Sequence, residues 1–179
     1  MDVRVLEEPV NEWSDALQLY YADREKYATS FQATILMSRI LQLFASILLR
    51  EERKVVIMER SPLTGELFIQ QLLKTSSAFG ADAGEQSMLQ HWFASMRKFL
   101  EDHFELATVY IRVGETECLR RVRERDRPGE SELDTQLLKD LHAMHESRFS
   151  THHVIEADNL TVSQVFEEFE RIASHLFGC

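Results

Sequence analysis

Val55-Val56-Ile57-Met58-Glu59-Arg60-Ser61 is the stretch that decides the fold, because an apolar run ends at once in an acid, a guanidinium and a hydroxyl. A short continuous apolar run followed by a helical pattern is typical of a buried strand in a parallel sheet. Open α/β sheets bind their ligands at the carboxyl ends of the strands. The stretch therefore predicts a ligand site around Glu59 and Arg60.

The rest of the chain alternates between strand-like and helix-like patterns. The further strands are expected at 3–6, 107–113 and 153–155, and the helices at 31–49, 63–73, 85–104, 115–125, 133–149 and 162–177. Asp134 and Thr161 are suited to cap helix N-termini. This alternation predicts an α/β fold, a parallel sheet wrapped by helices, in one domain over residues 1–179.

Composition narrows the class of protein. The 179 residues are enough for one sizeable core, with 44% hydrophobic and 28% charged residues. The net charge of −10 disfavours general binding to nucleic acid or to anionic membranes. Two cysteines, Cys118 and Cys179, are too few for a disulfide framework. With no signal peptide or spanning run in sight, we expect a soluble cytoplasmic protein.

Glu8 stands at the end of the first expected strand, directly before Pro9. Proline has no amide hydrogen to donate and therefore ends the strand there. A carboxylate at the strand's mouth can accept a proton from a hydroxyl nucleophile. The alternative interpretation is an ordinary surface acid before a turn.

Arg60 follows the buried strand, where an unpaired guanidinium would be costly. It either pairs with Glu8 or Glu59 in a structural role, or it holds an anionic group of a substrate. The sequence alone leaves both interpretations open.

A cluster of arginines lies near the expected helix 115–125. Arg121 and Arg125 share one helical face, and Arg127 follows just before a Pro-Gly pair. Three converging guanidiniums would clamp phosphate oxygens. The alternative is a solvated helix face in which Glu124 and Asp126 neutralise the arginines.

The helix expected over 31–49 offers two features. Phe31 and Gln32 present an aromatic ring and an amide, a pair suited to a nucleobase, although a phenylalanine inside a helix usually belongs to the core. Its apolar residues cover more than one face, which suggests contact with a partner as well as a core.

The order and spacing of several motifs resemble the deoxynucleoside kinase family, which includes deoxycytidine, deoxyguanosine and mitochondrial thymidine kinases. The resemblance covers nearly all of the chain. The motifs are Glu7-Glu8-Pro9-Val10, Trp13, Tyr21, Phe31-Gln32, Ser38-Arg39-Ile40, Glu59-Arg60-Ser61, and the stretch from Leu119 through Leu141-His142 to His145-Glu146-Ser147.

The resemblance implies a fold, an activity and a set of roles. The fold would be a P-loop-kinase-like parallel sheet, and the reaction would transfer the γ-phosphate of ATP, with Mg²⁺, to a deoxynucleoside 5′-hydroxyl. Glu8 would be the general base, with Arg60 near the transferring group and Glu59 placing magnesium. The residues implied at the nucleoside are Trp13, Tyr21, Phe31, Gln32, Arg39, Gly65 and Glu130. Those implied at ATP are Arg121, Arg125 and Arg127 over its phosphates, and Glu156 and Asp158 near its adenine. Helix 31–49 would pack in a homodimer interface.

The sequence also departs from the family pattern. None of its glycines is arranged as Gly-x4-Gly-Lys-Ser/Thr, so the phosphate-binding loop and the first, central strand are missing from these residues. We therefore expect little or no kinase activity from them. Gly65 stands where relatives have an acid or alanine, so Arg39 must find another partner, such as Glu66, or swing outward.

Two rival functions remain. One is a non-catalytic module that binds nucleosides or pairs with a kinase. The other is a nucleoside monophosphate kinase, which Glu8-Pro9 disfavours because a carboxylate there would repel a phosphorylated acceptor. The base is expected to be a pyrimidine, with thymidine and deoxyuridine tolerated at least as well as deoxycytidine.

Overall fold

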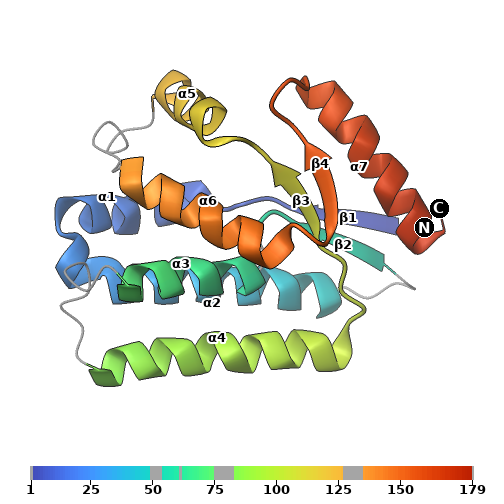
Figure 1. The fold of residues 1–179 in the computed structure, drawn as a ribbon. Helices are drawn as coiled ribbons and strands as arrows, with labels where there is room; N and C mark the ends of the chain where they lie inside the picture. The colour runs from blue at the N-terminus through green and yellow to red at the C-terminus, as the bar shows by residue number, and fades with distance from the viewer. Residues whose placement is uncertain (1, 49–53, 61, 75–82, 127–134, 179) are drawn as a thin grey trace. The chain divides into compact units, whose positions relative to one another are not determined.

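A computed structural model describes residues 2–48, 54–60, 62–74, 83–126 and 135–178 (Figure 1). The chain divides into two compact units, Met1–Phe104 and Glu105–Cys179, and we describe each by itself. The single domain over residues 1–179 stays a prediction.

The first unit combines two parallel strands with helices. Its elements are β1 (Asp2–Leu6), the 3-10 helix η1 (Val10–Trp13), α1 (Ser14–Ala22), α2 (Arg24–Leu48), β2 (Lys54–Met58), α3 (Pro62–Lys74) and α4 (Ala83–His103). β1 and β2 pair in parallel, with Leu6 opposite Met58. The predicted strands 3–6 and 55–58 are confirmed, and each begins one residue earlier than expected.

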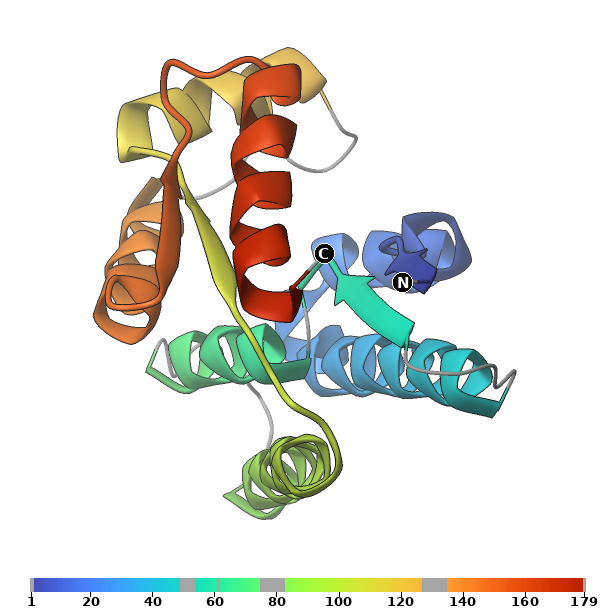
Figure 2. The ribbon, with the colours of Figure 1, turned by 90° about the vertical axis from the view of Figure 1, so that its right-hand side faces the viewer.

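The helices of the first unit build its core. Figures 1 and 2 show α2 and α3 between the β1–β2 pair and α4. The core cluster takes Ala28 and Leu36 from α2, Ile69 from α3, and Leu89 and Phe93 from α4. The helices predicted over 63–73 and 85–104 correspond to α3 and α4, whose apolar faces meet there.

Asp23 explains why α2 begins earlier than the predicted residue 31. Its Oδ1 accepts a hydrogen bond from the Lys26 amide at 3.0 Å, as an N-cap does. Its own amide donates to the Leu19 carbonyl at 3.0 Å and ends α1. Helices α1 and η1 were not predicted from the sequence, in which no glycine or proline separates α1 from α2.

The second unit is also built on a parallel strand pair. Its elements are β3 (Val109–Arg112), α5 (Glu115–Arg125), α6 (Thr135–Phe149), β4 (His153–Glu156) and α7 (Val162–Phe177). Val109 lies opposite His153 in the β3–β4 register. Figures 1 and 2 show α6 and α7 on opposite sides of this pair. The bounds predicted for α5 and α7 are confirmed, and β3 is shorter than the predicted 107–113.

Helix α7 has well-formed ends. Thr161 Oγ1 accepts a hydrogen bond from the Gln164 amide at 3.3 Å, and the Gln164 side chain accepts from the Thr161 amide at 2.9 Å. This capping box confirms the predicted cap at Thr161. Gly178 ends the helix in the left-handed conformation, with φ of 67°. The cap predicted at Asp134 lies outside the described residues.

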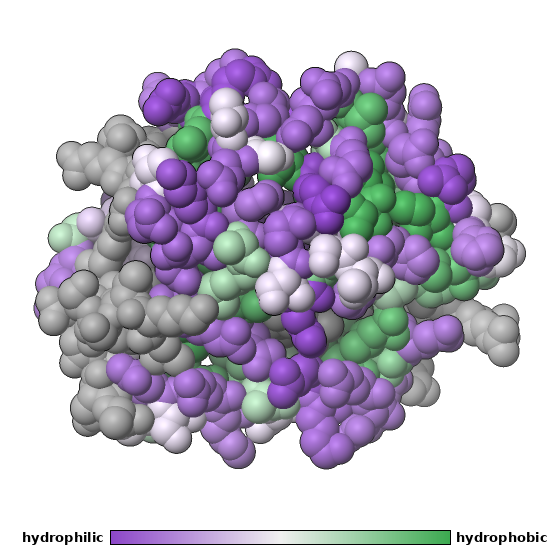
Figure 3. All heavy atoms as spheres, in the orientation of Figure 1, coloured by the Kyte–Doolittle hydropathy of each residue, from purple (hydrophilic) through white to green (hydrophobic). Residues whose placement is uncertain are grey.

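Apolar side chains also reach the surface. Figure 3 shows one face that is largely hydrophilic, with hydrophobic side chains gathered in patches. On α2, Met37, Leu41 and Phe44 are exposed at helical spacing, as its wide apolar surface predicted.

Within the described residues no helix has the length and apolar character needed to cross a bilayer.

Candidate functional site

Glu8 lies just beyond the carboxyl end of β1. The Val10 amide donates to the Glu8 carbonyl at 2.8 Å, so the chain turns at Pro9 into η1 instead of extending the strand. The Glu8 side chain is 17% exposed. It borders a cavity of about 540 Å³ that is also lined by residues 4–6 of β1, by the rest of the turn as far as Glu12, and by Gln42 and Ala45 of α2. The carboxylate is therefore partly buried yet reachable.

Arg39 of α2 is the largest fully buried side chain of the first unit and is 1% exposed. Its Nη1 donates to the Glu7 carbonyl at 3.2 Å and to Gln42 Oε1 at 3.4 Å. Its Nη2 lies 3.4 Å from Glu8 Oε1. Arg39 thus fixes the end of β1 through a backbone carbonyl and faces the carboxylate of the next residue.

Trp13 covers the other side of this arginine. Its ring centroid lies 5.5 Å from the Arg39 guanidinium carbon, a cation–π arrangement. The indole is buried, and its Nε1 donates to Ser38 Oγ at 2.9 Å. Ser38 in turn donates to the Ile35 carbonyl, so the ring is held in place against α2.

Glu59 and Arg60 follow β2 and are exposed. Burial lowers the pKa of Arg39, Glu8 and Glu59 oppose this shift, and Arg60 adds to it, so these four charges influence one another. Arg60 adopts a left-handed φ of 49° and lies over the Phe68 ring at 5.2 Å. The structural interpretation of Arg60, an ion pair with Glu8 or Glu59, is not found among the described residues, where Glu8 faces Arg39 instead.

Phe31 and Gln32 are both buried in α2. The Phe31 ring stacks on Tyr20 of α1, with centroids 4.9 Å apart and planes 17° from parallel. Tyr20 also contacts Tyr21, at 5.7 Å. Phe31 and Tyr21, both predicted at the nucleoside, therefore belong with Tyr20 to one aromatic group that joins α1 to α2.

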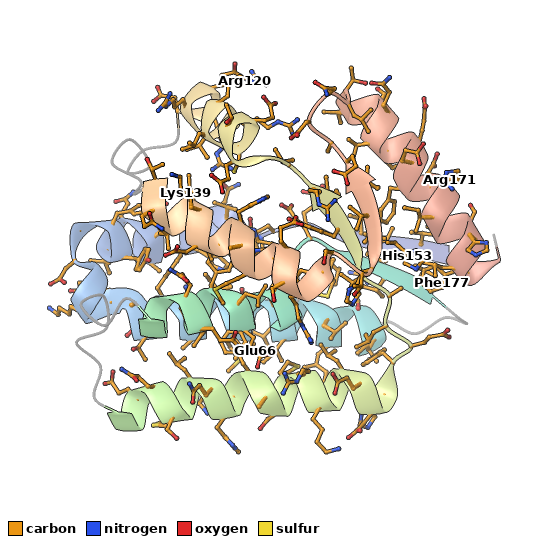
Figure 4. All side chains as sticks on the ribbon, in the orientation of Figure 1. Glu66, Arg120, Lys139, His153, Arg171 and Phe177 are labelled. Atoms are coloured by element: carbon orange, nitrogen blue, oxygen red, sulfur yellow. The ribbon has the colours of Figure 1, made fainter. Side chains whose placement is uncertain are left out.

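Gly65 packs closely against α4. A Cβ atom built on it would lie 2.5 Å from Phe93 Cε1, so this position accommodates no side chain unless the ring moves. The neighbouring Glu66 forms an ion pair with Arg97 of α4 at 2.9 Å (Figure 4). Arg39 does have another partner, as expected, but this partner is Glu8 and not Glu66, which is paired with Arg97. Arg39 is buried and does not swing outward.

In the second unit, Arg121 is anchored at both ends of its guanidinium. Its Nε donates to Glu117 Oε1 at 2.7 Å and its Nη2 to the Ala157 carbonyl at 2.8 Å. The neighbouring Arg120 pairs with Glu117 and Glu124 on the outer side of α5 (Figure 4). Hydrogen bonds from Arg120 and Arg121 lower the pKa of Glu117 to about 2.

The other predicted phosphate residues fare differently. Arg125 lies in the last turn of α5. Arg127 lies outside the described residues, as does Glu130, which was predicted at the nucleoside. The interleaved acid Glu124 does neutralise Arg120, so part of this face matches the solvated alternative.

The loop after β4 is tied back to α5. Asp158 Oδ1 accepts a hydrogen bond from the Gly114 amide at 2.6 Å, at the N-terminus of α5. A carboxylate there is favoured by the helix dipole. Glu156 pairs with Arg112 of β3. Of the residues predicted near an adenine, Asp158 thus lies in the same loop as the Ala157 carbonyl that holds Arg121, and Glu156 is the last residue of β4.

One polar cluster in the second unit was not predicted from the sequence. Glu146 Oε1 accepts hydrogen bonds from the Tyr110 hydroxyl and Arg112 Nε, both at 2.9 Å. Burial and then Glu146 raise the pKa of Tyr110. Burial acts to raise the pKa of Glu146, but the hydrogen bonds from Tyr110 and Arg112 leave it lowered. The available signal was the His145-Glu146 pair on α6, quoted only as a matching motif.

Comparisons with known proteins bear on this arrangement. The family model described as deoxynucleoside kinase matches residues 1–176. Protein 143R of Invertebrate iridescent virus 6, named as a kinase, is 26% identical over 164 residues, which cover 92% of this chain and 78% of that protein. The thymidine kinase of Ictalurid herpesvirus 1 is 30% identical over 159 residues (86% and 65%). The deoxycytidine kinase of Mus musculus is 28% identical over 137 residues (74% and 52%). The chain therefore spans only about half to two thirds of the length of the last two relatives.

Proposed function

The chain belongs to the deoxynucleoside kinase family, and from this premise we propose that it binds a deoxynucleoside for ATP-dependent phosphorylation of the 5′-hydroxyl. The observation that supports this most is the placement of Glu8. It is a partly exposed carboxylate at a cavity, just past the end of a parallel strand, as a base for a hydroxyl nucleophile needs to be.

The first unit would hold the nucleoside. Glu8 accepts the hydrogen bond of the 5′-hydroxyl and then its proton, while Arg60 balances negative charge at the same oxygen. Phe31 and Gln32 bind the base beside Trp13. Tyr21 and Arg39 complete the nucleoside pocket of this unit, and Gly65 gives the close packing behind it.

The second unit would serve the donor. Bound ATP supplies the phosphoryl group, and Mg²⁺ screens its charge. Arg121 and Arg125, with Arg127, would balance phosphate charge, and the loop of Glu156 and Asp158 would lie near the adenine. Arg121 fits this role through the part of its guanidinium that Glu117 and Ala157 leave free.

Magnesium would depend on Glu59. Among the described residues no three His, Cys, Asp or Glu side chains gather as metal ligands. Mg²⁺ bound with nucleotide phosphates keeps several waters and takes one or two protein carboxylates, so a single exposed Glu59 fits. The residues present therefore suit an ion that arrives with ATP.

The base and the assembly state extend the proposal. The Gln32 amide can donate and accept, which suits either pyrimidine, and Gly65 offers no carboxylate to an amino group. Thymidine and deoxyuridine would then bind at least as well as deoxycytidine. The exposed Met37, Leu41 and Phe44 of α2 would pack in a homodimer.

Calorimetric titration of the purified 179-residue chain tests the acceptor half. We expect saturable binding of thymidine, and weaker binding of its ribonucleoside counterpart 5-methyluridine. Equal affinity for both, or none for either, would contradict a deoxynucleoside pocket.

Phosphoryl transfer is tested separately, because the sequence has no Gly-x4-Gly-Lys-Ser/Thr motif. We expect the 179 residues alone to release little thymidine monophosphate from ATP and thymidine. A fusion that places a relative's first strand and glycine-rich loop before residue 1 should be active. Binding without transfer in the fusion would favour a non-catalytic nucleoside-binding module.

A further inference from the structure

Arg39 combines deep burial with unused hydrogen-bonding capacity. Its Nε and Nη2 are buried and have no hydrogen-bond partner among the described residues. Its Nη1, by contrast, has two acceptors, the Glu7 carbonyl and Gln42 Oε1. The guanidinium is therefore fixed at one nitrogen and has donors to spare on the side where Glu8 lies.

Glu8 supplies the carboxylate that faces those donors. Gly65 carries no side chain and has no room for one beside Phe93. Both carboxylate oxygens of Glu66 accept hydrogen bonds from Arg97 Nη1, Oε1 at 3.1 Å and Oε2 at 2.9 Å. Within the described residues, Glu8 Oε1, 3.4 Å from Nη2, is the carboxylate in an ion pair with Arg39.

The surroundings hold Arg39 in this orientation. The Trp13 ring packs on the guanidinium and is itself fixed through Ser38 to α2. The Gln42 amide also donates to the Glu7 carbonyl at 3.1 Å, so two α2 side chains form hydrogen bonds with the backbone immediately before Glu8. A side chain confined in this way can orient the group it faces.

We propose that Arg39 is a positioning residue that orients the Glu8 carboxylate toward the nucleoside 5′-hydroxyl. It does so by holding the end of β1 through the Glu7 carbonyl and by offering Nη2 to one oxygen of Glu8. The other oxygen is then available to the hydroxyl. The inference rests on the proposed function, since it gives Arg39 a role at the reacting end of the nucleoside instead of at the base.

The test measures the hydrogen bond between Glu8 and the 5′-hydroxyl directly. Thymidine and 5′-deoxythymidine differ only in that hydroxyl, so the ratio of their dissociation constants reports its contribution. A hydrogen bond to a charged acceptor predicts a ratio of about 10 or more for the unmodified chain. For Arg39→Met we expect a ratio below about 3, with the affinity for 5′-deoxythymidine changed less than about threefold, because a misdirected carboxylate loses only the hydroxyl.

Two further variants separate positioning from general structural damage. Arg39→Lys keeps the charge but not the planar fork, so its ratio should fall between those of the unmodified chain and Arg39→Met. Arg97→Met is the matched control, because it breaks an arginine–glutamate pair of the same unit that does not touch Glu8. Its ratio should equal that of the unmodified chain.

The outcomes are distinct. An unchanged ratio in Arg39→Met, with both ligands weakened alike, would overturn the positioning role and leave the proposed function intact. If Arg39→Met does not fold, an unchanged ratio in Arg39→Lys would overturn it equally. A ratio near 1 in the unmodified chain would instead remove Glu8 from the 5′-hydroxyl, and the proposed function would fall together with this inference.

Discussion

The two units treat their charges in opposite ways. The first unit encloses Arg39, at 1% exposure, between an indole, a backbone carbonyl and Glu8. The second unit spreads its arginines over a helix surface, where the Arg120 side chain is 53% exposed and pairs with acids on its own helix. Removing one partner of a buried charge leaves that charge uncompensated, whereas an exposed charge that loses its partner is still hydrated by water. We therefore expect single substitutions to have larger effects in the first unit than at the exposed arginines of the second unit.

The largest expected effect concerns chemistry in the first unit. Glu8→Gln preserves shape and removes the base, so turnover of an active loop-bearing fusion should fall by about 10²–10⁴, with a modest change in thymidine binding. Steady-state kinetics with thymidine and ATP give both quantities. Glu168→Gln, on the exposed face of α7, is the matched control and should leave turnover unchanged. Near-normal turnover in Glu8→Gln would make the acid structural.

The next effect concerns the core of the first unit. Leu89 is fully buried among residues of α2, α3 and α4, so Leu89→Ala should lower the free energy of unfolding by about 2–5 kcal/mol. Urea denaturation followed by circular dichroism measures the change. The neighbouring Met88 is exposed, and Met88→Ala should cost less than about 0.5 kcal/mol. Equal losses for the two variants would show that α4 does not pack as described.

A smaller effect is expected from adding an atom to the same core. In Gly65→Ala the new Cβ would meet the Phe93 ring at 2.5 Å. Overpacking of this kind destabilises by about 1–3 kcal/mol, although alanine favours the helix over glycine by up to about 1 kcal/mol. We expect a net loss of unfolding free energy that Phe93→Leu relieves in the double variant. A stabilising Gly65→Ala would contradict the close approach of α3 and α4.

The smallest effect belongs to the exposed pairs of the second unit. Arg120 and Arg121 lower the pKa of Glu117 from 4.5 to about 2, so the pairing stabilises the folded state above pH 4.5 and is lost as the pH falls toward 2. Arg120→Ala should raise the pKa of Glu117, as followed by carboxyl NMR. The variant's melting temperature should lie only slightly lower at pH 7, and the gap should close below pH 4.5. A large gap at neutral pH would mean that this surface pair matters as much as the buried one.

The sequence predicted those strands and helix ends that depend only on residues close together in the chain. Val55–Met58 forms the predicted strand, although its side chains are half-buried and not buried as expected, and Thr161 with Gln164 specifies its own capping box. The early start of α2 at Asp23 followed the same local rules and could have been predicted from the capping preference of aspartate.

The Arg39–Glu8 ion pair could not be predicted in this way. The two residues are far apart in sequence, and from the sequence Glu66 was an equally suitable partner for Arg39. In the structure α3 packs on α4, and Glu66 pairs with Arg97. Likewise, nothing local to Gly65 shows that its missing side chain makes room for Phe93. Which side chains become partners depends on which helices pack together, and this packing cannot be predicted from a single sequence.

The indole beside Arg39 also makes this region optically observable. The sequence holds two tryptophans, of which Trp13 is 4% exposed and Trp92 is 42% exposed. Trp92→Phe would leave Trp13 as the one tryptophan emitter, with its Nε1 bonded to Ser38 and its ring against a guanidinium. Because indole emission responds to nearby charge and to water, a ligand that rearranges Glu8 and Arg39 should change its intensity or wavelength. The protein thus contains its own fluorescent reporter, packed against the arginine that pairs with Glu8.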